Sequence, residues 1–161
     1  MSRSAVLMVC MGNICRSPTA EGVLRDKLAR AGLADKVVVD SAGTHAWHEG
    51  EPPDYRSVKH ALQRGYDIAS LRARPVIDAD FERFDLILAM DSDNLSLLRE
   101  RCPSQHQGKL SRLTAHALRF NSLSVPDPYS GGAAGFDQVL DLVEDACDGL
   151  VAHLAGLVER N

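Results

Sequence analysis

Residues 5–18 have the sequence AVLMVCMGNICRSP. The apolar run that ends at Val9 is typical of a central strand that is buried on both faces of a parallel sheet. The polar, glycine-containing segment Cys10–Ser17 follows, and Ser17-Pro18 has the pattern of a helix N-cap with proline in the first helical position. This stretch therefore predicts a buried strand, a tight turn and a helix N-terminus in direct succession.

The rest of the chain continues to alternate strand and helix patterns. Further buried strands are predicted over Val37–Val39 and Leu86–Ala89, and a fourth over Lys109–Leu113. The longest helical stripe of apolar residues runs from Phe136 to Leu154. This alternation predicts an α/β fold in three layers, a parallel sheet with helices on both faces. The 161 residues have the size of a single domain, which we expect to cover 1–161.

Capping and turn residues predict several boundaries. One helix is expected to begin after Asp54, and another after Asp91 or Asp93. Asp40–Gly43 is predicted to be the turn that follows the second strand. The glycine cluster Gly131–Gly135 is predicted to be a flexible connector before the last helix.

The composition excludes several classes of protein. A net charge of −4 argues against a nucleic-acid binder, and 45% hydrophobic with 25% charged residues is ordinary for a soluble globular protein. Four cysteines are too few for a secreted disulfide scaffold, and the histidines and cysteines lack zinc-ligand spacing, so neither a metal nor a cofactor is predicted. The sequence has no segment of membrane-spanning length, and a reduced, cytoplasmic protein is the simplest prediction.

The segment Cys10–Ser17 combines the features of an anion cradle with a nucleophile at its start. Backbone N–H groups of a turn that ends at a helix N-terminus can point at an anion, and the helix dipole adds partial positive charge. Gly12 permits the tight turn, and Arg16 offers a planar fork of donors that matches two phosphate oxygens. Because such surroundings favour a thiolate, Cys10 is the predicted nucleophile, and Ser17 can donate a hydrogen bond to its sulfur.

The sequence CMGNICRSP resembles the phosphate-binding loop of low-molecular-weight protein tyrosine phosphatases. Four further segments resemble this family in the same order along the chain; they are DSAG from Asp40, WxxGxxPD from Trp47, MDxxN from Met90 and DPY from Asp127. The likeness covers most of the chain. It implies a four-stranded parallel sheet and a phosphoric monoester hydrolase that acts on phosphotyrosine in proteins without a cofactor.

The resemblance also implies roles for individual residues. Cys10 would attack phosphorus and form a cysteinyl-phosphate, Arg16 would hold the phosphate, and Asp127 would protonate the leaving oxygen and later activate water. Phosphate-like anions would inhibit, and small aryl phosphates would also be hydrolysed. Ser41 would support the loop through a polar network. The implied substrate-binding residues are Met11, Gly12, Asn13, Ile14, Cys15, Ser17, Trp47 and Tyr129, the two aromatic ones as apolar walls of a slot.

Three positions qualify this resemblance. Leu71 stands where some relatives have a histidine that belongs to the polar network supporting the loop, so one support of the loop is absent or replaced in this chain. Ser130 stands where some have a second aromatic residue, which would leave a wider and less selective slot. Cys15 matches a cysteine that, in part of the family, forms a reversible disulfide with the nucleophile, which implies redox sensitivity.

Three other functions remain open. A thiol-dependent arsenate reductase of the same fold would need two more cysteines that relay a disulfide, for which Cys102 and Cys147 are distant candidates. A phosphoarginine phosphatase of the same family would carry Thr where this chain has Ile14, and the apolar side chain favours phosphotyrosine. A non-catalytic phosphotyrosine-binding module would need neither Cys10 nor Asp127, and both are present.

Overall fold

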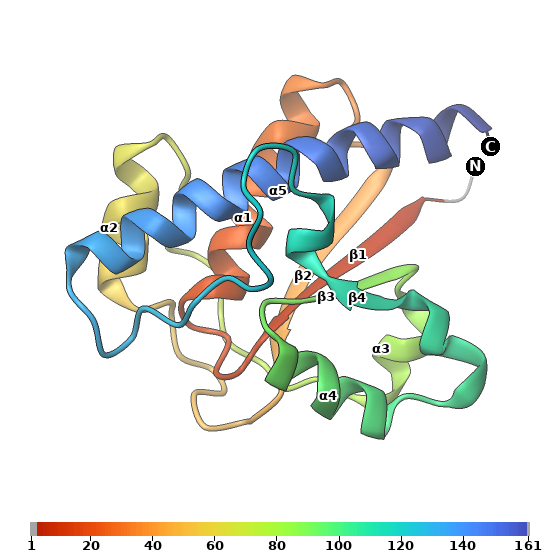
Figure 1. Ribbon diagram of the computed structural model, residues 1–161, viewed down its shortest axis with the longest axis horizontal. Coiled ribbons are helices and arrows are strands. Elements are labelled where there is room, and N and C mark those ends of the chain that lie inside the picture. The colour runs from red at the N-terminus through yellow and green to blue at the C-terminus, as the bar shows by residue number, and fades with distance from the viewer. Residues whose placement is uncertain (1–2, 161) are drawn as a thin grey trace.

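Figure 1 shows the computed structural model, which describes residues 3–160 of the chain. Residues 1, 2 and 161 of the predicted domain lie outside the described residues. In chain order the strands and helices are β1 (Ser4–Cys10), α1 (Arg16–Arg30), β2 (Val37–Gly43), α2 (Tyr55–Gln63), α3 (Asp78–Arg83), β3 (Leu86–Ala89), α4 (Ser92–Arg101), β4 (Leu110–Arg112) and α5 (Ala133–Arg160). Two short 3₁₀ helices, Ser104–Lys109 and Leu113–His116, flank β4.

The four strands form one parallel sheet in the order β2-β1-β3-β4, which confirms the predicted sheet. β1 lies between two neighbours, and residues 6–9 are 0% exposed, which explains its uninterrupted apolar sequence. Cys10 pairs with Gly43 of β2, and Val9 pairs with Ala89 of β3. The carboxyl ends of these three strands therefore meet at one edge of the sheet, which is where α/β folds of this kind bind their ligands.

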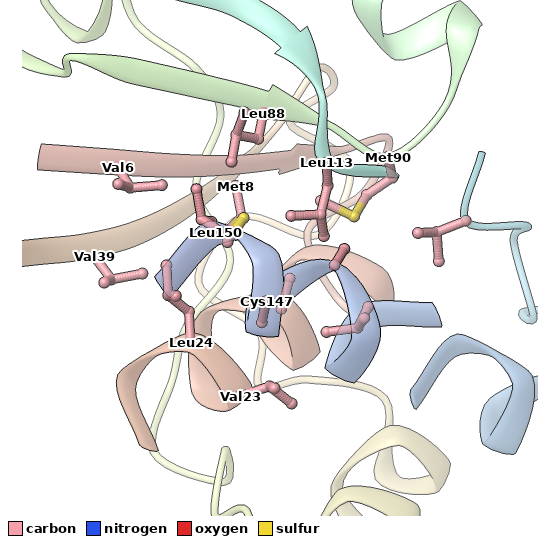
Figure 2. Close-up of a cluster of buried hydrophobic side chains, with 14 of the residues drawn as sticks. Val6, Met8, Val23, Leu24, Val39, Leu88, Met90, Leu113, Cys147 and Leu150 are labelled. Carbon is pink, nitrogen blue, oxygen red and sulfur yellow. The ribbon is translucent and has the colours of Figure 1, made fainter. Parts of the chain in front are cut away.

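The sheet is covered on both faces, as the alternation of elements predicts. Figure 1 shows α1, α2 and α5 on one side of the sheet and α3 and α4 on the other. Met8 of β1 belongs to the cluster that includes Leu24 of α1 and Leu150 of α5, and Figure 2 shows these side chains together. Leu7 belongs to the opposite cluster with Phe81 of α3. The period-two alternation of a strand thus supplies both cores.

Some predicted boundaries are wrong. β2 continues to Gly43, so Asp40–Gly43 is strand and not turn, because these residues pair with β1 as far as Cys10. α1 begins at Arg16, before the predicted cap at Ser17, whose hydroxyl is bonded to other side chains of the loop. α3 has no counterpart among the predicted helices.

The last helix carries the predicted stripe. The side chains of Phe136, Leu140, Cys147 and Leu154 are all at most 2% exposed. α5 begins at Ala133, so the predicted connector Gly131–Gly135 is already helical in its second half. Within residues 3–160, no helix is both long enough and apolar enough to cross a membrane.

Candidate active site

Residues 10–17, here called the Cys10 loop, join the end of β1 to the start of α1. Cys10 is 3% exposed, and its Sγ lies 3.0 Å from Ser17 Oγ, as expected for a donor to the sulfur. The outer side of the loop is fixed by backbone bonds, from Thr44 N–H to the Cys10 carbonyl at 2.8 Å and from His45 N–H to the Met11 carbonyl at 3.0 Å. Gly43 allows this close approach, because a Cβ there would lie 2.8 Å from the Met11 oxygen.

Asn13 sits at the centre of the polar network. Its φ of 59° is in the left-handed region, and its Nδ2 donates to Ser17 Oγ at 2.8 Å and to Ser41 Oγ at 3.0 Å. Its Oδ1 accepts from the Arg74 backbone N–H at 3.0 Å. Ser41 in turn donates to Glu21 at 2.7 Å. The structure thus brings the predicted residues Asn13, Ser17 and Ser41 together.

Two members of this network were missed from the sequence. Glu21 is 2% exposed, and burial raises its carboxyl pKa, while the Ser41 hydroxyl and Arg25 counter the rise. The Arg74 backbone N–H supplies the bond to Asn13 from a distant segment. Leu71, where a histidine strut was expected in relatives, packs against the hydrophobic cluster of the α1 side. Glu21 and Arg74 therefore provide the support around Asn13 in this chain.

Arg16 is the largest buried polar side chain of the site, with 2% exposure. Its Nη1 donates to Asp91 Oδ2 at 2.6 Å and to the Val125 carbonyl at 3.0 Å. Asp91, which also caps α4 through the Asn94 N–H at 2.7 Å, was predicted only as a cap. A carboxylate and a carbonyl on the same Nη1 fix the orientation of the guanidinium plane and leave its other N–H groups for a ligand.

A cavity of about 190 Å³ opens at the carboxyl edge of the sheet. It brings together residues from three separate segments of the chain. Asn13 and Ser17 are absent from its lining and act behind the wall, whereas His48, which lines it, was not predicted as a site residue. The lining residues are Cys10, Met11, Gly12, Ile14, Cys15, Arg16, Trp47, His48, Asp127 and Tyr129.

The two aromatic walls are held from outside the cavity. Trp47 is 66% exposed and stacks on the His45 ring at a centroid distance of 4.2 Å. Tyr129 is 51% exposed, and the Arg56 guanidinium lies 5.6 Å from its ring centroid. Ser130, which follows Tyr129, is exposed. An apolar slot with polar groups at one end can hold an aromatic ring with an anion attached.

Asp127 lies in residues 125–132, here called the Asp127 loop. Its Oδ2 is 3.9 Å from Arg16 Nη2, and its side chain is 47% exposed. Its Oδ1 accepts from the Tyr129 backbone N–H at 3.0 Å. The cavity therefore has a thiol and a guanidinium on the Cys10 loop and a carboxyl on the Asp127 loop, the set that a two-step phosphoryl transfer needs.

A family model for low molecular weight phosphotyrosine protein phosphatases matches residues 5–159. The chain belongs to this family. A low molecular weight protein-tyrosine-phosphatase of Streptomyces coelicolor is 42% identical over 96% of this chain and 95% of its own. The crystal structure of an Entamoeba histolytica protein tyrosine phosphatase with Hepes in the active site has a TM-score of 0.93 and 43% identity, over 95% of this chain and 97% of that one.

A second similar structure contains a ligand with an aromatic ring. It is Vibrio vulnificus Wzb in complex with benzylphosphonate, with a TM-score of 0.81 and 27% identity over 93% of this chain and 98% of that one. These similarities identify the chain as a protein tyrosine phosphatase, a phosphoric monoester hydrolase.

The second cysteine of this phosphatase has a different environment from the first. Cys15 is 5% exposed, and burial raises the pKa of its thiol to about 12, although a hydrogen bond with Ser57 opposes the rise. Cys15 is therefore a neutral thiol at neutral pH. All four cysteines, Cys102 and Cys147 included, are free and buried.

Proposed function

We propose that the enzyme hydrolyses phosphotyrosine in proteins, and small aryl phosphates, through a cysteinyl-phosphate on Cys10. The observation that carries the proposal is the single cavity lined by Cys10, Arg16 and Asp127. In the first step Cys10 Sγ attacks phosphorus, the bond from phosphorus to the phenol oxygen breaks, and Asp127 gives that oxygen its proton. In the second step water attacks phosphorus, Asp127 accepts a proton from it, and the sulfur–phosphorus bond breaks to release phosphate.

The Cys10 loop supplies the electrostatic part of this mechanism. The fork of Arg16 and the backbone N–H groups of residues 11–16 bind the equatorial phosphoryl oxygens, where negative charge is concentrated in the transition state. Asp91 keeps the fork in its orientation through the 2.6 Å bond to Nη1. The Ser17 hydroxyl, 3.0 Å from the sulfur, stabilises the thiolate as it leaves phosphorus.

The shape of the cavity favours an aromatic substrate. Trp47 and Tyr129 line the slot that holds the ring, and Ile14 offers an apolar surface where a phosphoarginine guanidinium would need a polar partner. Benzylphosphonate in the Vibrio vulnificus relative pairs an aromatic ring with a tetrahedral anion, and Hepes in the Entamoeba relative carries a sulfonate. Phosphate-like anions are therefore expected to inhibit this enzyme.

An arsenate reductase is disfavoured by the positions of the other cysteines. Cys147 belongs to the hydrophobic cluster on the α1 side of the sheet, and Cys102 belongs to the cluster on the α4 side. The sheet separates these two thiols, so they cannot pass a disulfide from one to the other without unfolding.

The location and extent of the enzyme are also proposed. The nucleophile must be a free thiol, and all four cysteines are free and buried, which suits a reducing, cytoplasmic compartment. We further infer that residues 1–161 act as one phosphatase domain, since the family model covers 5–159. Cys15, which lines the cavity with Cys10, provides for reversible oxidation of the site.

The direct test compares phosphotyrosine, phosphoserine and phosphoarginine peptides of matched sequence. We expect turnover of phosphotyrosine and of phenyl phosphate, with the other two peptides slower by about 100-fold or more, because they lose the aromatic contacts and the fit of the slot. Cys10→Ser should abolish turnover and still bind inorganic phosphate, since the cradle remains. Faster cleavage of phosphoarginine, or near-normal turnover by Cys10→Ser, would refute the assignment.

A further inference from the structure

Arg56, in the first turn of α2, holds the Asp127 loop from outside the cavity. Its Nε and Nη2 donate to the two carboxylate oxygens of Asp54, at 3.1 and 2.9 Å. Nη2 also donates to the Tyr129 carbonyl at 2.9 Å. The guanidinium lies over two rings, 5.6 Å from the Tyr129 centroid and 4.7 Å from the Phe136 centroid. One side chain thus contacts the end of the Asp127 loop and the start of α5.

The opposite end of this contact reaches the Cys10 loop. The Asp54 backbone N–H donates to the Ile14 carbonyl at 2.8 Å. The Asp54 carboxylate also accepts a hydrogen bond from the Arg56 backbone N–H at 2.9 Å and so caps α2. Its bonds to the Arg56 side chain lower its pKa, although partial burial opposes this shift. A continuous series of bonds therefore runs from Ile14 through Asp54 and Arg56 to Tyr129.

Asp127 lies midway between two anchors of its loop. Two residues before it, the Val125 N–H donates to the Met90 carbonyl at 2.7 Å, and the Val125 carbonyl accepts from Arg16. Two residues after it, the Tyr129 carbonyl accepts from Arg56. Val125 is 0% exposed, whereas Tyr129 is half exposed. The second anchor is thus the more accessible one, and its strength depends on the Arg56 side chain.

We propose that Arg56 is a positioning residue for the proton donor Asp127. Among the described residues, those that line the cavity do not include Arg56, so it acts through the loop and not on the substrate. The Arg56 guanidinium connects Asp54, which is bonded to the Cys10 loop, with Tyr129 of the Asp127 loop. Removing the Arg56 side chain would let the Asp127 carboxyl move away from the leaving oxygen. The inference rests on the proposed function, in which Asp127 protonates that oxygen.

The chain offers a matched control at the C-terminal cap of the same helix. Arg64, two turns along from Arg56, bonds to Asp141 and Glu144 of α5. It makes the same kind of contact between α2 and α5 but lies away from the Asp127 loop. Arg64→Ala therefore reproduces the loss of an arginine bridge without releasing Tyr129.

The test measures single-turnover phosphoryl transfer from phenyl phosphate and from p-nitrophenyl phosphate. Arg56→Ala should slow transfer from phenyl phosphate by about 10–100-fold, because a misplacement of about 1 Å has effects of this size. The p-nitrophenyl ester, whose leaving group needs the proton less, should slow by less than about threefold. Arg56→Lys keeps the charge but not the planar fork, so its rate with phenyl phosphate should lie between those of Arg56→Ala and the parent. Arg64→Ala should transfer the phosphoryl group as fast as the parent. Melting temperatures show whether each variant is folded. If Arg56→Ala is not folded, Arg56→Lys is used in its place.

A second background separates this inference from the proposed function. In the Asp127→Asn enzyme, adding Arg56→Ala or Arg56→Lys should not slow phosphoryl transfer from phenyl phosphate any further, because the carboxyl that Arg56 positions is gone. Equal slowing of both esters, or a full additional loss in Asp127→Asn, would overturn the positioning role. If Asp127→Asn alone keeps the parent's dependence on leaving group, the acid role fails and the inference with it. If Asp127→Asn steepens that dependence and the folded Arg56 variants do not, only the inference fails.

Discussion

The Cys10 loop and the Asp127 loop line one cavity but are held in different ways. In the Cys10 loop, Cys10, Asn13, Arg16 and Ser17 are at most 3% exposed, and their side chains bond to one another or to neighbouring segments. In the Asp127 loop, Asp127 and Tyr129 are about half exposed. The groups proposed to bind the phosphate are thus preorganised, whereas the proposed proton donor lies at an open edge.

This difference has a physical reason. Donors that stabilise developing charge are most effective when they need no reorganisation during the reaction, which burial and a complete network provide. The proton donor must reach the leaving oxygen of each substrate that enters, so its loop has to lie at the entrance. Changes in the Cys10 loop should therefore slow all substrates alike, and changes around Asp127 should slow those with poor leaving groups.

The largest effect is expected for Arg16→Lys. Lysine keeps the charge but loses the planar fork, which bonds to Asp91 and the Val125 carbonyl and is proposed to bind phosphate. We expect kcat/KM to fall by about 100–1000-fold, the usual effect of removing a preorganised transition-state donor. The kcat/KM values for phenyl phosphate and for p-nitrophenyl phosphate should fall by the same factor. A loss below about tenfold, or one that grows with leaving-group pKa, would contradict the role given to Arg16.

A smaller effect is expected when the network around Asn13 is broken. Asn13→Ala removes the hydrogen bonds to Ser17, Ser41 and the Arg74 N–H and places alanine at a φ of 59°. Because loop geometry would shift, kcat/KM should fall by about 10–100-fold for every substrate. Unfolding free energy should drop by about 2–4 kcal/mol, from unpaired buried groups and left-handed backbone.

Asn13→Gly is the control that divides this effect. Glycine accepts the positive φ without strain but removes the same hydrogen bonds. If the network is what matters, Asn13→Gly should lose nearly as much activity as Asn13→Ala while recovering about 1 kcal/mol of stability. Full activity in Asn13→Gly would mean that Asn13 serves only to accommodate the backbone, and that the bonds to Ser17 and Ser41 contribute little.

The same two loops mark how far the sequence alone could predict this site. The Cys10 loop is contiguous, so strand, turn, helix start and phosphate-type cradle could be predicted from local patterns. Asp127 could be predicted only through the family resemblance, since it stands in an ordinary Asp-Pro turn. The contact of Arg16 with Asp91 joins residues 75 positions apart, and only the order of strands in the sheet brings them together.

The residues that were missed share this non-local character. Glu21 has a charged side chain at a helical position that would ordinarily face solvent, yet it bonds to Ser41 of β2. Arg56 follows a helix cap and would ordinarily be a surface arginine. Asp40–Gly43 was wrongly predicted as a turn because its polar residues hide a strand whose pairing with β1 decides its conformation. In each case tertiary contact, and not local preference, sets the outcome.

The smallest effect on turnover is expected for Cys15→Ser, which nevertheless tests the proposed oxidation chemistry. Serine is close to cysteine in size, and Cys15 is a neutral thiol, so kcat/KM should change by less than about threefold. With peroxide, the Cys10 thiol takes one oxygen to become a sulfenic acid, and water is released. The Cys15 thiol loses its proton and its sulfur attacks the Cys10 sulfur; hydroxide leaves, takes up that proton as water, and a disulfide forms that dithiothreitol can reduce.

The raised pKa of Cys15 gives this reaction a characteristic pH dependence. Attack requires the Cys15 thiolate, and with burial raising its pKa to about 12 only a small fraction is ionised at neutral pH. The rate of disulfide formation should therefore rise about tenfold per pH unit over the range below that pKa in which the enzyme stays folded. Peptide mapping after peroxide treatment should find Cys10 linked to Cys15, and dithiothreitol should restore the parent but not Cys15→Ser after prolonged exposure. A pH-independent rate, or equal recovery of both proteins, would show that Cys15 does not protect the nucleophile.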